Sequence, residues 1–286
     1  MVGAFCEAAA VVQSTQLQAT RTVLVAALAV QTLALVTRSV LNRHLEQNYG
    51  LAPRVAADSS YLVVPAVLVL VGAPLFTRAA AFLRALFACS LLTWKVVATG
   101  IALGLSLRLA WWAAVISHAS LNVGGTAEPM FWFACQPAGQ TLVYLLAMVA
   151  LAPVIEEVIN RGFVLHGLLR FGPGVALAGS SLLFGAIHPP GSIPAATLIG
   201  VVLGFAVLRS GALWASVIAH ATYNALIALD WRCLHALWPA TPPDSIWSQV
   251  WIVTVPVMLG SLLAIARLII RLAPAGACPP VRRDSI

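Results

Sequence analysis

The chain has 286 residues, of which 61% are hydrophobic and only 9% charged, with a mean hydropathy of +0.95 and a formal net charge of +7. A soluble domain carries about 25% charged residues, so the composition excludes a soluble globular protein. The basic residues are dispersed between apolar runs, which argues against a nucleic-acid partner. We predict an all-α fold, a polytopic bundle of about eight transmembrane helices in the lipid bilayer.

The apolar runs that approach the roughly 20 residues of a membrane span lie near 22–41, 60–77, 86–107, 109–123, 139–160, 174–188, 193–208, 212–229 and 247–270. The first run follows a Gln-rich leader that has no basic region and no cleavage site, so we expect a retained anchor. Arg84, Lys95 and Arg108 interrupt the first half. Residues 78–95 are therefore a candidate amphipathic helix at the membrane interface.

Loop charges orient the second half of the chain. The turns near Arg170 and Arg209 are basic, as is the tail, whereas 124–138 and 189–192 contain no Lys or Arg. Basic loops stay on the cytoplasmic side, so the C-terminus is predicted to be cytoplasmic. High usage of Ala, Val, Leu and Arg, with Lys95 the only lysine, suggests a GC-rich gene. We expect an integral protein of a bacterial inner membrane.

Ionisable residues inside spans are costly and are functional candidates. The densest group is APVIEEVINR, where Glu157 and Arg161 are four residues apart and share one helix face. Glu156, about 100° round the helix, lacks that partner and is a candidate general base. His188 ends an apolar run just before two prolines. As alternatives, the glutamates mark a helix leaving the membrane, and His188 is an interfacial residue.

The stretch WASVIAHATYN, residues 214–224, places His220 within a span and Asn224 one turn further on. This spacing puts both side chains on one helix face, where they could hold the same polar object or act as glue between helices. WAAVISHASLN, residues 112–122, nearly repeats it with His118 and Asn122. An old duplication and chance similarity are both open explanations.

Three motifs now stand in order on successive apolar helices: EEVINR (156–161) fits EExxxR, FGAIH (184–188) fits FxxxH, and HATYN (220–224) fits HxxxN. This pattern resembles the CPBP intramembrane proteases, which include the CAAX prenyl endopeptidases and the Abi-like bacteriocin-processing or self-immunity proteins. The resemblance covers a core at 139–229, between N-terminal membrane helices of unrecognised type (1–138) and a region (230–286) with a loop, the last span and a basic tail. It implies the catalytic set Glu156, Glu157, Arg161, His188, His220 and Asn224, with Phe184 for packing.

The resemblance implies hydrolysis of an amide bond within the membrane. Glu156 would take a proton from water and deliver it to the leaving amine, with His188 holding that water. His220 and Asn224 would donate hydrogen bonds to the oxyanion, while Glu157 and Arg161 brace the helix and set the charge state of Glu156. HxxxN comes last in the family order, so the His118 copy is expected to have a packing or cavity role.

No cofactor is expected. The open alternative is zinc, which two histidines and a glutamate can bind, although HExxH is absent and five scattered cysteines form no CxxC pair.

The favoured function is an intramembrane endopeptidase whose partner is a membrane-associated peptide or protein. Its substrate would be a C-terminal sorting tail, a leader peptide or a lipidated C-terminus, and a bacterial gene makes a prenylated one less expected. Two alternatives remain: a proton-coupled secondary transporter with a relay through Glu156 and His188, and a non-catalytic, peptide-binding immunity-type protein. The near-repeat is the only sequence support for the transporter.

Overall fold

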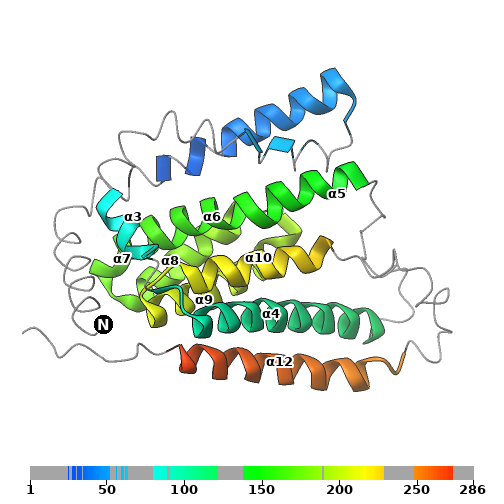
Figure 1. Cartoon of the computed structure of the whole chain (residues 1–286). Helices are drawn as coiled ribbons and strands as arrows, with labels where there is room; N and C mark the ends of the chain where they lie inside the picture. The colour runs from blue at the N-terminus through cyan, green and yellow to red at the C-terminus, as the bar shows by residue number, and fades with distance from the viewer. Residues whose placement is uncertain are drawn as a thin grey trace, which may run out of the picture.

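The computed structural model describes residues 25, 28–29, 31–33, 35–51, 56, 59–60, 62–63, 80–88, 91–121, 138–188, 190–228 and 248–272. In these ranges all regular elements are helical, which confirms the all-α prediction (Figure 1). They are α3 (Ala80–Leu86), α4 (Trp94–Leu121), α5 (Ala138–Tyr144), η2 (Leu145–Leu151), α6 (Ala152–Glu157), η3 (Val158–Leu165), α7 (His166–Leu168), η4 (Leu169–Phe171), α8 (Pro173–Ala186), η5 (Pro190–Ser192), α9 (Ile193–Ser210), α10 (Trp214–Ala228) and α12 (Trp251–Arg271).

Four described helical stretches are long and apolar enough to cross a membrane: Trp94–His118, Thr141–Phe171, Ile193–Ser210 and Trp251–Arg271. The protein is therefore an integral membrane protein with a polytopic helical bundle. Helix α8 is apolar but shorter. The expected run at 60–77 lies almost wholly outside the described residues, and that at 22–41 partly so. The count of about eight spans stays a prediction.

Two expectations for the first half of the chain are wrong. From Trp94 to Leu121 the two runs expected at 86–107 and 109–123 form one continuous helix, α4, and α3 ends at Leu86 instead of continuing as an amphipathic helix over 78–95. Helix α4 continues through Arg108 because that side chain is buried inside the bundle. Its guanidinium lies 4.8 Å from the ring centroid of Trp112 and 5.4 Å from that of Tyr223, and aromatic faces attract a cation.

Helix α4 packs between α10 and α12, and small residues set its distance from α10 (Figure 1). Gly100 lies against Ile218, and Gly104 lies against the backbone of Ala219, so α4 and α10 run in the same direction. Close approach of backbones at glycine is a common way to join membrane helices. Helix α12 runs the other way, and Ser117 Oγ and Thr254 Oγ1 are 2.6 Å apart.

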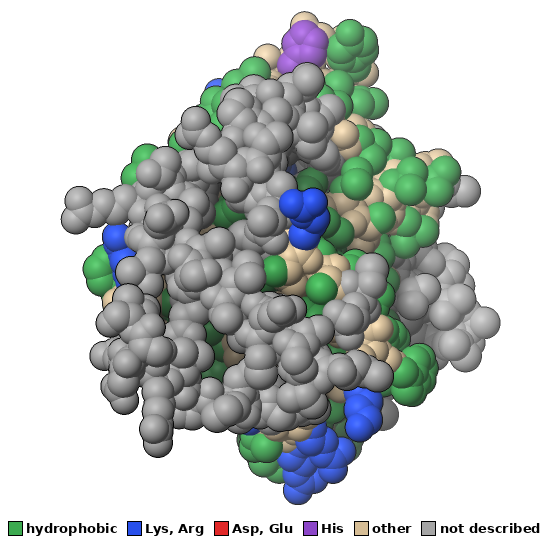
Figure 2. All heavy atoms as spheres, turned by 60° about the vertical axis from the view of Figure 1, so that its left-hand side comes forward, with side chains coloured by type: hydrophobic (Ala, Val, Ile, Leu, Met, Phe, Trp, Pro, Cys, Tyr) green, Lys and Arg blue, Asp and Glu red, His purple; other side chains and the backbone are tan. Residues whose placement is uncertain are grey.

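One end of the bundle is basic. Leu86, Leu165, Ala176 and Leu213 form a buried cluster there, which brings together the end of α3, the region before Arg170 and the turn after Arg209. Arg209 also donates a hydrogen bond from Nη2 to the carbonyl of Ile270, at 3.3 Å, near the end of α12. Figure 2 brings this end forward and shows Lys and Arg side chains on it. The charged turns that the sequence placed on one side of the membrane thus lie at one end, while the cytoplasmic assignment of that end stays a prediction.

Candidate active site

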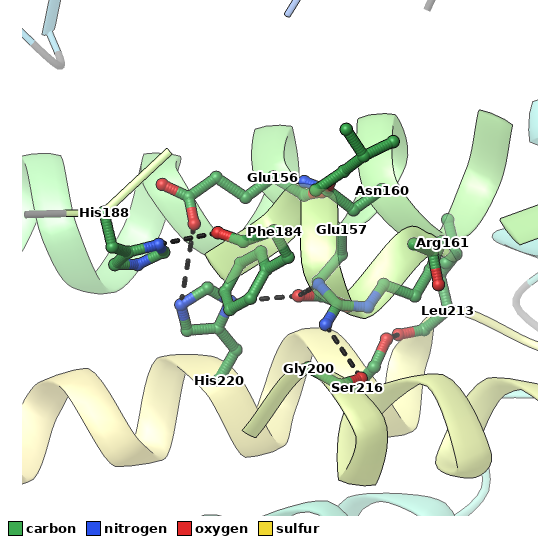
Figure 3. Close-up of polar contacts among 12 residues, drawn as sticks. Glu156, Glu157, Asn160, Arg161, Phe184, His188, Gly200, Leu213, Ser216 and His220 are labelled. Carbon is green, nitrogen blue, oxygen red and sulfur yellow. Dashed lines mark hydrogen bonds and ion pairs between the residues drawn. The ribbon is translucent and has the colours of Figure 1, made fainter. Parts of the chain in front are cut away.

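The polar residues of the three motifs lie on three helical segments that meet inside the bundle (Figure 3). Glu156 and Glu157 end α6, His188 follows α8, and His220 lies in α10. Glu156 precedes Phe171 by 15 residues and His188 follows Pro173 by 15 residues. At 1.5 Å per helical residue, both lie roughly 22 Å from the turn that joins their helices. The short α8 thus brings His188 to the level of Glu156.

Glu157 is the centre of a buried ionic cluster. Its Oε1 accepts a hydrogen bond from Arg161 Nη1 at 2.8 Å and another from His220 Nδ1 at 3.0 Å, and the side chains of both Glu157 and Arg161 are 0% exposed. Arg161 Nη2 donates to the carbonyl of Gly200, at 3.1 Å, which ties the pair to α9. The four-residue spacing thus forms the expected ion pair, and the carboxylate also orients a histidine from another helix.

This contact defines the orientation of His220. A carboxylate oxygen only accepts hydrogen bonds, so Nδ1 of His220 carries a proton and Nε2 is directed toward Glu156. Nε2 lies 3.9 Å from Glu156 Oε2, which is too long for a direct hydrogen bond. Both side chains are buried, with 5% of His220 and 7% of Glu156 exposed. A carboxylate and a ring nitrogen therefore face each other at a distance that suits a shared small polar group.

Phe184 packs among the charged groups. Its ring centroid is 4.8 Å from that of His188 and 5.7 Å from that of His220, and Arg161 Cζ lies 4.3 Å from it. The backbone carbonyl of Phe184 accepts a hydrogen bond from His188 Nδ1 at 2.8 Å, which leaves His188 Nε2 as the second nitrogen of that ring. Figure 3 shows the Glu156 carboxylate and the two histidine rings at one end of this group, with Arg161 toward the other.

Asn224 contacts a break in the helix that carries the glutamates. Segment η2 is a π-helix, in which the N–H of Ala152 bonds to the carbonyl of Ala147. The corresponding π partner of the Met148 carbonyl is residue 153, which is a proline and has no N–H. Asn224 Nδ2 donates to that carbonyl at 2.7 Å. Within the protein, His220 and Asn224 therefore contact different groups.

A second π-helix, η3, follows the glutamates, and side chains hydrogen-bond to backbone carbonyls in it and just before it. His166 Nδ1 donates to the carbonyl of Arg161 at 2.6 Å, and Asn160 Nδ2 donates to the carbonyl of Glu156 at 2.9 Å. π turns occur often at functional sites. Asn160 and Gly200 were not singled out from the sequence. Asn160 could have been found from the sequence, because it is a polar residue between the glutamates and Arg161 in an apolar run. Nothing in the sequence around Gly200 indicates its contact with Arg161.

The earlier His-Asn copy is not part of this group. The His118 side chain is exposed on α4 and Asn122 lies outside the described residues, so the packing or cavity role of this copy stays a prediction. Ser117 occupies in the first copy the position that Ala219 occupies in the second. The two positions do not face each other where α4 packs on α10, because Gly104 lies opposite Ala219.

The donor set was compared with what the zinc alternative requires. In the part of the chain that the structure describes, no three His, Cys, Asp or Glu side chains are grouped so that they could hold a metal ion. His220 Nδ1 is directed at Glu157 and His188 Nδ1 at a backbone carbonyl, and the second nitrogen of a metal-bound histidine is commonly held in this way. The zinc alternative therefore stays untested, and no chemical step is assigned to a metal.

The protein is a membrane protein whose apolar helices enclose a polar site made of two carboxylates, a guanidinium and imidazoles. Residues 138–226 match the family described as type II CAAX prenyl endopeptidase, Rce1-like, which confirms the resemblance inferred from the three motifs. No curated protein and no solved structure matches the chain. The family match supports a membrane protease, a hydrolase with a membrane-associated substrate.

Proposed function

We propose that the protein is an intramembrane endopeptidase that cleaves a peptide bond of a membrane-associated protein by glutamate-activated water. The observation that carries this proposal is the 3.9 Å approach of Glu156 Oε2 to His220 Nε2, between two helices and inside the bundle. A purely structural role would not require the Glu156 carboxylate at this place, because Glu157 already forms the ion pair with Arg161.

Charge balance supports a role for each member of the cluster. Glu156 and Glu157 carry two negative charges and Arg161 one positive charge, so protonation of His220 on both nitrogens brings the sum to zero. Nδ1–H then donates to Glu157, as the 3.0 Å contact requires, and Nε2–H is available to an oxyanion. A preorganised donor of this kind is worth about 3–4 kcal/mol of transition-state stabilisation.

The reaction starts with a water between Glu156 and the histidines. His188 Nδ1 donates to the Phe184 carbonyl, so in the neutral ring Nε2 accepts a hydrogen bond from one O–H of that water, which keeps this proton. Glu156 takes the other proton while the water oxygen bonds to the substrate carbonyl carbon. The C–N bond then breaks, and the proton moves from Glu156 to the leaving amine, so that one water yields a new carboxyl end and a new amino end.

Asn224 contributes a second oxyanion donor in this scheme. A side-chain amide has two N–H donors, and one of them is directed at the Met148 carbonyl. The other is available to the substrate, and the first bond fixes the amide on the helix that also carries Glu156. We favour a leader peptide or a C-terminal sorting tail as substrate over a prenylated C-terminus, on the composition of the gene.

The experiment is cleavage by the purified protein, in detergent, of a peptide that contains one membrane segment, run in H₂¹⁸O and analysed by mass spectrometry. A hydrolase gives two defined fragments, with one ¹⁸O in the new carboxyl end. A transporter or a binding protein gives intact peptide. Intact peptide across a panel of sorting-tail, leader and prenylated substrates would overturn the proposal.

A further inference from the structure

The N-terminal region contributes one buried polar side chain to the neighbourhood of the site. Gln31 is only 7% exposed and lies on a helical stretch of which residues 31–33 and 35–49 are described. Figure 1 shows this stretch along the side of the bundle formed by α5 and α6. Residues 1–137 precede the segment that matches the family.

Gln31 bridges the two helices that carry Glu156 and His188. Its Nε2 donates to Asn160 Oδ1 at 3.4 Å and lies 3.5 Å from the carbonyl of Leu183. Asn160 in turn donates to the backbone carbonyl of Glu156, at 2.9 Å, and Leu183 directly precedes Phe184. One side chain thus joins η3 to α8 about one helical turn from the two groups that would hold the water.

This arrangement is costly for stability. Gln31 Oε1 is buried and has no hydrogen-bond partner among the described residues, and a buried unsatisfied polar atom costs about 1–3 kcal/mol. An apolar side chain of the same length would avoid that cost. Polar groups kept inside a membrane protein at such a cost are functional candidates.

We propose that Gln31 is a positioning residue of the peptidase site, which acts through Asn160 and Leu183 to set the distance between Glu156 and His188. The inference rests on the proposed function. It makes the N-terminal helix a part of the enzyme and not only an anchor. A displacement of about 1 Å between reacting groups can reduce turnover by 10²-fold.

The test is the near-isosteric change Gln31→Met, which removes the donor and retains the volume. We expect kcat to fall by 10-fold or more with KM within twofold of wild type, while the melting temperature in detergent stays equal or rises because the unsatisfied carbonyl is gone. Thr32→Val, on the exposed neighbour whose hydroxyl donates to the Leu28 carbonyl of its own helix, is the matched control and should retain wild-type kcat. A purely structural role would lower the melting temperature and leave kcat unchanged.

The route through Asn160 is tested by a double-mutant cycle. Asn160→Ala should itself reduce kcat, and Gln31→Met should then have little further effect in that background. If wild type cleaves and Gln31→Met has a wild-type kcat, or if the two changes multiply, the inference is wrong and the proposed function stands. If wild type cleaves no substrate, the proposed function fails and the inference fails with it.

Discussion

The packing of α4 on α10 predicts that a single methyl group at Gly104 slows catalysis. A Cβ at this position would lie 2.5 Å from the carbonyl oxygen of Ala219 and 2.6 Å from Thr222 Cβ. Ordinary contact begins near 3.4 Å, so the shortfall, 3.4 minus 2.5, is about 0.9 Å. Helix α10 must move by roughly this distance, and His220 moves with it. A displacement of this size can cost about 10²-fold in turnover.

The stability change follows from the same geometry. Overpacking costs about 1–3 kcal/mol, whereas Gly→Ala within a helix gains up to about 1 kcal/mol. Gly260→Ala on α12 is the control, because a new Cβ there has no atom within 4 Å. Its change in unfolding free energy reports the gain in helix propensity without overpacking. The difference in unfolding free energy between the two variants should therefore be about 1–3 kcal/mol, measured by thermal denaturation in detergent beside peptide cleavage. If Gly104→Ala is as stable as Gly260→Ala and cleaves at the wild-type rate, α4 does not position α10.

Three further changes test the cluster. Glu157→Gln should destabilise the fold by about 3–5 kcal/mol, because it leaves the buried Arg161 without its counter-ion; a wild-type melting curve would show that the pair does not form. His220→Ala should abolish cleavage in a folded protein, whereas His118→Ala should retain most activity, and equal losses in the peptide assay would assign the earlier copy to the site. Asn224→Ala should lower the unfolding free energy by about 1–3 kcal/mol through the lost bond to a π-turn carbonyl and also slow cleavage; loss of stability alone would limit this side chain to a structural role.

The fold class and the Glu157–Arg161 pair could be predicted because they depend on local information. Hydropathy defines membrane helices by composition alone, and two side chains four residues apart meet on any helix. The family of the segment 138–226 was also predictable, since the motifs stand at fixed spacings. The catalytic roles assigned from the motifs stay predictions.

Features that depend on partners distant in sequence could not be predicted. Arg108 interrupts an apolar pattern, and its burial against Trp112 and against Tyr223 from another helix accounts for α4 continuing through it. Pro153 signals an irregular helix, but the sequence does not show that Asn224 would bond to the released carbonyl.

The central claim is that the Glu156 carboxylate is the base that activates water. Glu156→Gln preserves the shape of the side chain and removes the base, so turnover of the membrane peptide should fall by about 10²–10⁴-fold while peptide binding and the melting temperature stay at wild-type values. Wild type treated with a chelator is measured in parallel, and we expect it to cleave at the untreated rate. Loss on chelation with rescue by Zn²⁺ would replace the metal-free mechanism by a metal-dependent one. Cleavage by Glu156→Gln at the wild-type rate would contradict the account.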